Sequence, residues 1–384
     1  MIEWVPLDDV AKVDRTAAST QQAATMPYVG LEHIEADTGA LVDGYSPVAG
    51  DVKATKFLFT PQHILYSKLR PYLNKRLRPT FDGVCSTEIL PILPKAGIAD
   101  RYYLFHYMGT KKFVEWASDN VSGANLPRLS PSLLAEAMIP YRPLPQQQAI
   151  AQRLERADRL RRLRQHALDI SDQYLQTVFL EMFGNPETNP KGWERAEIGE
   201  VIALSQYGTS QKSNSEGLGY PVIGMNHVTY SGRLEVNGYS HVQLNRTDFE
   251  NLRLRRGDVL FNRTNSTDLV GKTAVWNLDL DAVPASYLIR IKLKDPVTPE
   301  FFAALLNTSH FKRLFVDRCK RAVSQSNISP TLLKEFVIYL PPRPMQDAFS
   351  SVVHKHERLR AMQVEALRQA DLLYEMLLEE AFRN

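Results

Sequence analysis

Two long stretches of the chain place their apolar residues at helical spacing, one from 145 to 183 and the other from 345 to 383. Neither stretch contains glycine. In the first, a spacing of four and three residues selects apolar positions such as Leu154, Leu168 and Leu175, with arginines between them at the centre. A stripe sustained over several heptads predicts a coiled coil, and about 38 residues of helix would reach about 57 Å.

The other two parts of the chain, residues 1–142 and 185–341, have a different pattern. Short apolar runs such as KFLFT and GDVLFNRT alternate with turns in both. Such runs are typical of β-strands bounded by turns. We therefore predict a mixed α/β (α+β) fold for each part, followed each time by a long helix.

The helical stretches belong to a longer repeat, because residues 130–183 align without a gap on residues 329–382. A period of this length exceeds that of a solenoid repeat, so each copy is a whole module. We expect internal pseudo-two-fold symmetry, with the two helices packed as an antiparallel coiled coil. Identical pairs include Ser130/Ser329, Glu136/Glu335, Gln147/Gln346, Arg161/Arg360 and Asp172/Asp371.

Four segments follow from these patterns. Residues 1–142 and 185–341 are predicted to be globular domains, and residues 143–184 and 342–384 are predicted to be helical spacers. The alternative is that each helix packs only on its own domain. A domain of about 140 residues has a radius of gyration of roughly 14 Å, so a helix this long would overhang it.

The two globular parts also match each other weakly. Residues 29–34 resemble residues 223–228, and residues 64–71 resemble residues 259–266. Apolar positions persist between the copies, whereas polar positions differ. We expect two copies of one fold whose surfaces recognise different targets.

Composition narrows the class of protein. The chain has 384 residues, 44% of them hydrophobic and 23% charged, which is typical of a globular protein with two or more domains. A net charge of +3 argues against a non-specific polyelectrolyte binder but permits local basic faces. We see no membrane-spanning run and no signal peptide. Cys85 and Cys319 lack metal-like spacing and are predicted to be buried thiols in a reducing cytoplasm.

Several stretches carry a family resemblance. They are IPYRPLPQQQAIAQRL (139–154), VIYLPPRPMQDAFSSVV (337–353), ILYSKLRPYLNK (64–75), CSTE (85–88), YGTSQK (207–212) and NISP (327–330). With the hinge and long helix occurring twice, the chain resembles the specificity subunit of type I restriction–modification systems. The second hinge departs from the family pattern, since Met345 and Asp347 stand where glutamine or glutamate is common.

The resemblance implies that the two globular parts are target recognition domains. They would read an asymmetric bipartite site on double-stranded DNA, one half-site each. The resemblance also implies partners, namely two methyltransferase (modification) subunits and a restriction/translocase subunit docked on this chain. The chain itself would be non-catalytic, without a cofactor, and would work in the cytoplasm at the nucleoid, away from membranes.

Signatures of catalysis are weak in this sequence. The string NPET (185–188) lacks the second proline and the aromatic residue of an adenine methyltransferase motif. No glycine-rich cofactor loop, P-loop or paired-histidine metal spacing stands out. His33 and His227 are equivalent in the repeat, and we predict core or DNA-facing positions for them. The alternatives to the specificity subunit are a self-contained DNA methyltransferase or nuclease and a protein–protein scaffold without DNA contact.

Candidate DNA contacts are the polar clusters at the ends of apolar strands, because binding residues concentrate in loops on a rigid scaffold. Each cluster could instead be an ordinary solvated loop, with Asn327 and Ser329 as capping residues. In the first domain the candidates are Ser67, Lys68, Arg70, Tyr72, Lys75, Ser122, Asn125 and Arg128. In the second they are Thr209, Ser210, Gln211, Lys212, Asn262, Arg263, Thr264, Asn265, Ser324, Gln325 and Asn327.

The repeat also makes a prediction about a truncated chain. A chain ending near Asn189 leaves its apolar stripe uncovered, so we expect it to form a symmetric dimer. We expect the antiparallel pairing to bring Arg161 and Arg164 of the two copies together. Like charges would then weaken the association, and salt would improve it.

Overall fold

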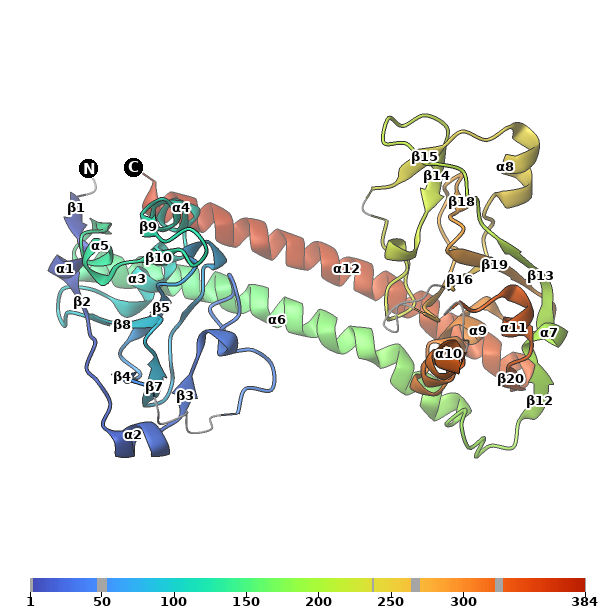
Figure 1. The fold of residues 1–384 in the computed structure, drawn as a ribbon, viewed down its shortest axis with the longest axis horizontal. Helices are drawn as coiled ribbons and strands as arrows, with labels where there is room; N and C mark the ends of the chain where they lie inside the picture. The colour runs from blue at the N-terminus through green and yellow to red at the C-terminus, as the bar shows by residue number, and fades with distance from the viewer. Residues whose placement is uncertain (1–2, 47–53, 237, 264–269, 322–326, 384) are drawn as a thin grey trace. The chain divides into compact units, whose positions relative to one another are not determined.

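The computed structural model describes residues 3–46, 54–236, 238–263, 270–321 and 327–383 (Figure 1). The chain divides into two compact units: a first unit of Met1–Gln165 with Ala366–Asn384, and a second unit of His166–Glu365. Each unit combines one mixed domain with a piece of both long helices, α6 (Leu144–Phe183) and α12 (Arg343–Phe382). The mixed α/β class and the two long helices are confirmed.

The elements occur in a similar order in the two units. Before α6 come β1 (Glu3–Pro6), α1 (Leu7–Val10), β2 (Ala11–Val13), α2 (Thr20–Thr25), β3 (Tyr28–Val29), η1 (Leu31–His33), β4 (Lys56–Phe59), β5 (Ile64–Ser67), η2 (Pro71–Leu73), β6 (Arg76–Leu77), β7 (Gly83–Ser86), β8 (Ile89–Pro94), α3 (Arg101–Met108), α4 (Lys111–Asp119), β9 (Val121–Ser122), β10 (Arg128–Leu129), α5 (Pro131–Ala135) and β11 (Met138–Tyr141). Between α6 and α12 come β12 (Glu194–Glu197), α7 (Ile198–Val201), β13 (Ile202–Tyr207), β14 (Tyr220–Ile223), η3 (Met225–His227), β15 (Ser240–Val242), α8 (Arg246–Leu252), β16 (Val259–Asn262), β17 (Thr273–Val275), β18 (Val283–Pro284), β19 (Leu288–Leu293), α9 (Pro299–Leu306), α10 (Ser309–Arg321), α11 (Pro330–Lys334) and β20 (Val337–Leu340).

Both units contain the same four-stranded antiparallel sheet. Its strand order is β2-β8-β5-β6 in the first unit and β13-β19-β16-β17 in the second. Each unit also has a parallel strand pair, which is β3 with β7 in the first and β14 with β18 in the second. The third strand beside that pair differs, because β4 joins β7 whereas β15 joins β14. The central sheet is therefore common to both units, and variation begins at the smaller sheet.

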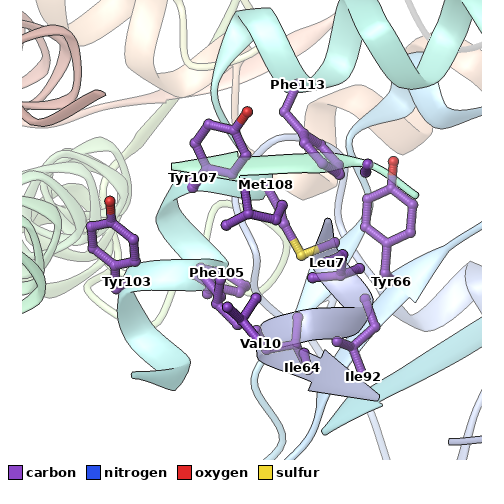
Figure 2. Close-up of a cluster of buried hydrophobic side chains, with 14 of the residues drawn as sticks. Leu7, Val10, Ile64, Tyr66, Ile92, Tyr103, Phe105, Tyr107, Met108 and Phe113 are labelled. Carbon is purple, nitrogen blue, oxygen red and sulfur yellow. The ribbon is translucent and has the colours of Figure 1, made fainter. Parts of the chain in front are cut away.

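Aromatic residues dominate both cores. In the first unit, Tyr107 of α3 and Phe113 of α4 pack edge to face, with ring centroids 5.5 Å apart, above sheet residues such as Ile64 and Ile92 (Figure 2). Such rings bury a large apolar area and favour this geometry. In the second unit the long helices contribute directly to the core, because Phe179 of α6 stacks on Phe301 of α9.

Two serines that are identical in the repeat make the same structural contact. Ser130 and Ser329 cap α5 and α11, each hydroxyl accepting a hydrogen bond from a backbone N–H three residues on. A proline follows each serine at the first helical position, where its missing N–H costs nothing. Cys85 and Cys319 are free and buried, as predicted. None of the helices in the described part of the chain combines the length and apolar character that crossing a membrane requires.

Candidate nucleic-acid interface

In the first unit, two candidate segments that are far apart in sequence form one surface. After β5 ends, the backbone pairs with the β9–β10 hairpin. The Leu129 N–H donates to the carbonyl of Lys68 (2.9 Å), and the Arg70 N–H donates to the carbonyl of Pro127 (2.8 Å). Candidates from residues 67–75 and 122–128 are thereby brought together.

The side chains on this surface are of two kinds. Arg70, Tyr72, Ser122 and Asn125 are exposed, with Tyr72 54% accessible, and Lys68 is half-buried. The other candidates are bonded within the protein, and these bonds fix the shape of the loops. Ser67 donates to the Leu69 carbonyl (2.7 Å), Lys75 donates to the Leu31 carbonyl (2.8 Å), and Arg128 donates to Glu88 (3.0 Å).

The second unit has a corresponding surface at the end of β16. The Thr209 N–H donates to the Pro284 carbonyl (2.8 Å), which draws residues 207–212 against the chain that leads into β19. The Arg263 N–H donates to the Tyr287 carbonyl (3.1 Å) from the other side. Asn327 lies beside this group, because the next residue, Ile328, donates to the Arg263 carbonyl (3.3 Å).

Here too, some candidates are presented and others are enclosed. Ser210, Gln211 and Lys212 are exposed. The buried Thr209 holds their turn, since its hydroxyl accepts from the Gln211 N–H (3.2 Å). Asn262 is fully buried, as is Ser67 at the equivalent end of β5. Thr264, Asn265, Ser324 and Gln325 lie outside the described residues.

Two tyrosines join this surface that sequence reasoning did not select. Tyr207 and Tyr287 are 42% and 53% exposed, and the Arg263 guanidinium lies over the Tyr207 ring, 4.5 Å from its centroid. An arginine held on an aromatic face keeps its donors in one plane while the ring remains available for stacking. The sequence contained one signal that could have identified Tyr207 as a candidate DNA contact, because this residue begins the polar YGTSQK stretch.

His33 and His227 have a local structural role. Each ends a short 3-10 helix and accepts a hydrogen bond through Nδ1 from the N–H of a glycine three residues earlier. The glycine is Gly30 in one unit (3.0 Å) and Gly224 in the other (2.9 Å). Within the described residues, no cluster of three histidine, cysteine or acidic side chains is arranged to hold a metal.

The long helices pair in an antiparallel manner within each unit. In the first unit Arg161 of α6 lies 3.9 Å from Asp371 of α12, and in the second unit Arg360 of α12 lies 2.8 Å from Asp172 of α6. Both arginines and both aspartates are repeat-identical, so the same contact is made twice. Burial alone raises the pKa of Asp172, but hydrogen bonds from Arg360 and Arg233 outweigh it and hold that pKa below its ordinary value.

The outer faces of these helices carry exposed apolar residues at equivalent positions. Leu160 and Leu163 of α6 are exposed in the first unit, and their equivalents Leu359 and Met362 of α12 are exposed in the second. The two residues of each pair are three positions apart on one helix and therefore share a face, and apolar residues exposed together are characteristic of protein–protein contacts. We call these four residues the outer apolar positions.

Known proteins that resemble this chain are type I restriction–modification specificity subunits. Residues 190–368 match the family model for the type I restriction modification DNA specificity domain. The chain is 34% identical over 205 residues to the specificity subunit of the type I restriction enzyme EcoDI of Escherichia coli, a match covering 52% of this chain and 45% of that protein. It is 28% identical over 191 residues to a putative type I restriction enzyme MjaX specificity subunit of Methanocaldococcus jannaschii, covering 47% of this chain and 44% of that protein.

A solved structure shares the fold. The crystal structure of the S subunit of a type I restriction–modification system from M. genitalium matches with a TM-score of 0.62 at 14% identity, covering 100% of this chain and 97% of that chain. At that identity the likeness concerns the fold alone. The matched region of the chain is therefore similar to the specificity subunits of type I restriction–modification systems. The matches span less than half the length of the two curated relatives.

Proposed function

We propose that this chain reads an asymmetric bipartite site on double-stranded DNA and supplies no catalysis of its own. Residues 1–142 and 185–341 act as the two target recognition domains, one half-site each, and residues 143–184 and 342–384 act as helical spacers. The observation that carries this proposal is the repeated four-stranded sheet with different residues at its strand ends. Strand β5 ends at Ser67 and is followed by Lys68, whereas the equivalent strand β16 ends at Asn262 and is followed by Arg263.

The chemistry of the exposed candidates supports DNA reading. Arg70 and Lys212 can meet phosphates, while Asn125 and Gln211 carry the paired donor and acceptor that recognise adenine in the major groove. Their differing identities in the two domains are what an asymmetric site requires. The candidate residues outside the described part of the chain belong to the same proposal.

The helices support the docking part of the proposal. The outer apolar positions recur at equivalent places, so one type of partner could bind twice in the same way. We assign these places to two methyltransferase subunits, with the restriction/translocase subunit joining the assembly they form. The complex would act on DNA in the cytoplasm, at the nucleoid.

The test of this function is the methylation motif produced by the chain together with its methyltransferase subunits. We expect an interrupted motif with two different half-sites. A continuous palindromic motif, or a motif that does not depend on this chain, would overturn the proposal. Calorimetry of the isolated chain with S-adenosylmethionine tests the alternative of a self-contained methyltransferase. We expect no measurable heat of binding, whereas a methyltransferase would bind this cofactor.

A substitution at Arg263 tests the proposed DNA contact of the second domain. Arg263→Ala in the complete complex should weaken binding of the specific duplex by about tenfold to a hundredfold, since a lost base or phosphate contact costs about 1–3 kcal/mol. Arg253→Ala is the matched control, because Arg253 lies in the same domain and pairs with Asp281 at 2.7 Å. Equal effects of the two variants would count against a DNA-facing Arg263.

A further inference from the structure

The contact between domain and helices can be compared position by position in the two units. Helices α3 and α9 begin after equivalent capping residues, Asp100 and Thr298. They end before equivalent threonines, Thr110 and Thr308, whose hydroxyls donate to carbonyls three residues earlier. This register makes His106 of α3 equivalent to Ala304 of α9.

In the first unit this contact is closed by a polar network. His106 is fully buried, and its Nε2 donates to Glu155 of α6 (2.7 Å), which also accepts from Arg78 (2.6 Å). Because Nε2 carries the proton toward the carboxylate, Nδ1 accepts from the hydroxyl of Tyr374 on α12 (2.8 Å). The Arg78 guanidinium also covers the ring of Phe105, 4.5 Å from its centroid. Side chains of one domain and two helices therefore fill the space.

In the second unit the equivalent place is a cavity of about 480 Å³. This cavity is lined by the equivalents of the five residues that form the first unit's network. Val275 stands in place of Arg78, Ala303 of Phe105, Ala304 of His106, His354 of Glu155 and Leu175 of Tyr374. Four of these five side chains are smaller than their counterparts. The helices and their caps are equivalent in the two units, but the second unit lacks the large side chains that would fill the space between domain and helices.

The lining of this cavity suggests its occupant. Phe179, Phe349 and Val353 provide apolar walls. Three carboxylates line the cavity, and each has a partner: Asp172 accepts from Arg360, Glu300 accepts from Ser350, and Glu357 lies 3.7 Å from His356. Among the described residues, no carboxylate pairs with the lining cations Lys312 and Arg358, although Lys312 donates to the Tyr230 carbonyl (2.8 Å). An apolar ring with a negative group beside it matches both features.

We propose that this cavity receives an aromatic side chain, flanked by an acidic residue, from a protein partner docked on the helices. The first unit supplies the precedent, because its own Phe105, His106 and Tyr374 place rings at the equivalent contact. The cavity lining includes Gln176 of α6 and Arg358 of α12, and Arg358 precedes the outer apolar position Leu359 on α12. The occupant therefore comes from the methyltransferase subunit, and in this respect the inference rests on the proposed function.

Two substitutions fill the cavity from different elements: Ala304→Phe from α9 and Leu175→Tyr from α6. Ala304→Ser is the matched control that leaves the space open. The full-length chain is first titrated with indole, a neutral ring, while its unfolding temperature is followed. We expect indole to raise the unfolding temperature of the wild type and Ala304→Ser, and to leave both filled variants unchanged. Folding of each variant is checked by its own unfolding temperature, which filling should maintain or raise.

Binding of the methyltransferase subunit is then measured for the same four proteins. We expect at least about tenfold weaker binding by the filled variants, because a buried aromatic anchor dominates its interface. Unchanged binding by a folded filled variant would overturn this inference alone, as would failure of the wild type to bind indole. Failure of the wild type to bind the methyltransferase subunit would overturn the proposed function and this inference together.

Discussion

The two units hold their domains to the helices with the same glutamine but present different residues at the strand ends. Gln147 accepts from the Asp100 N–H (2.9 Å), and Gln346 accepts from the Thr298 N–H (3.0 Å). Beyond β5 and β16, by contrast, the exposed side chains have little in common. Repeat identity therefore marks the scaffold, and repeat divergence marks the surfaces assigned to DNA.

The domain–helix contact is an exception inside the scaffold. A buried His106 network occupies the first unit, whereas Ala304 borders an open cavity in the second. The difference lies in packing rather than in the backbone, because the flanking caps coincide.

His106→Ala should have the largest effect on stability, lowering the free energy of unfolding of the first unit by about 3 kcal/mol. The substitution leaves Glu155 and the Tyr374 hydroxyl without their buried partner. Ala304→Ser at the equivalent position should change the second unit by less than about 0.5 kcal/mol. Hydrogen exchange resolved by unit measures both, and equal losses would contradict the contrast.

Gln147→Ala and Gln346→Ala should each cost about 2 kcal/mol, because each removes buried hydrogen bonds to the backbone. Gln147 donates to the Ile98 and Arg142 carbonyls, and Gln346 donates to the Pro341 carbonyl. Exposed Gln148 offers the control, where alanine should be nearly neutral. If only one of the two variants lost stability, the glutamine contact would contribute differently to the two units, which would contradict this prediction.

The first unit should also lose stability in mild acid. Burial lowers the pKa of His106 below its ordinary 6.5, despite the adjacent Glu155 carboxylate. The unfolded chain then binds a proton that the folded chain does not, so the free energy of unfolding falls as pH drops below about 6.5. The His106→Ala variant should show a shallower fall over pH 5–6.5 in chemical denaturation. Parallel profiles would rule out this contribution.

The truncated chain tests the helix pairing, and the structure corrects one expectation for it. Since Arg161 lies opposite Asp371, and Asp371 is the repeat equivalent of Asp172, Arg161 of one copy would face Asp172 of the other. The expected meeting of like charges is therefore wrong. Light scattering of a chain ending at Asn189 should show a dimer that weakens modestly with salt. A monomer, or strengthening by salt, would contradict this pairing.

Much of this fold could be predicted because it depends on local pattern. The stripe around Leu154 and Leu168 identified α6, and the alternative of a capping role for Ser329 is confirmed at the start of α11. Contacts across long sequence separations could not be predicted. Nothing near Arg128 indicates that it bonds to Glu88, and nothing near Ala304 indicates a cavity. The exposed fractions of Tyr207 and Tyr287 are likewise known only from the fold, although Tyr207 stands beside a polar loop in the sequence.

The most direct test of the central claim is exchange of residues 1–142 for the same domain of a relative with a different methylation motif. The altered chain is expressed with the methyltransferase subunits, and the methylated motif is read by sequencing. We expect one half of the motif to change to that of the relative, with the other half and the spacer unchanged. A change in both halves, or in the spacer length, would contradict the assignment of one half-site to each domain.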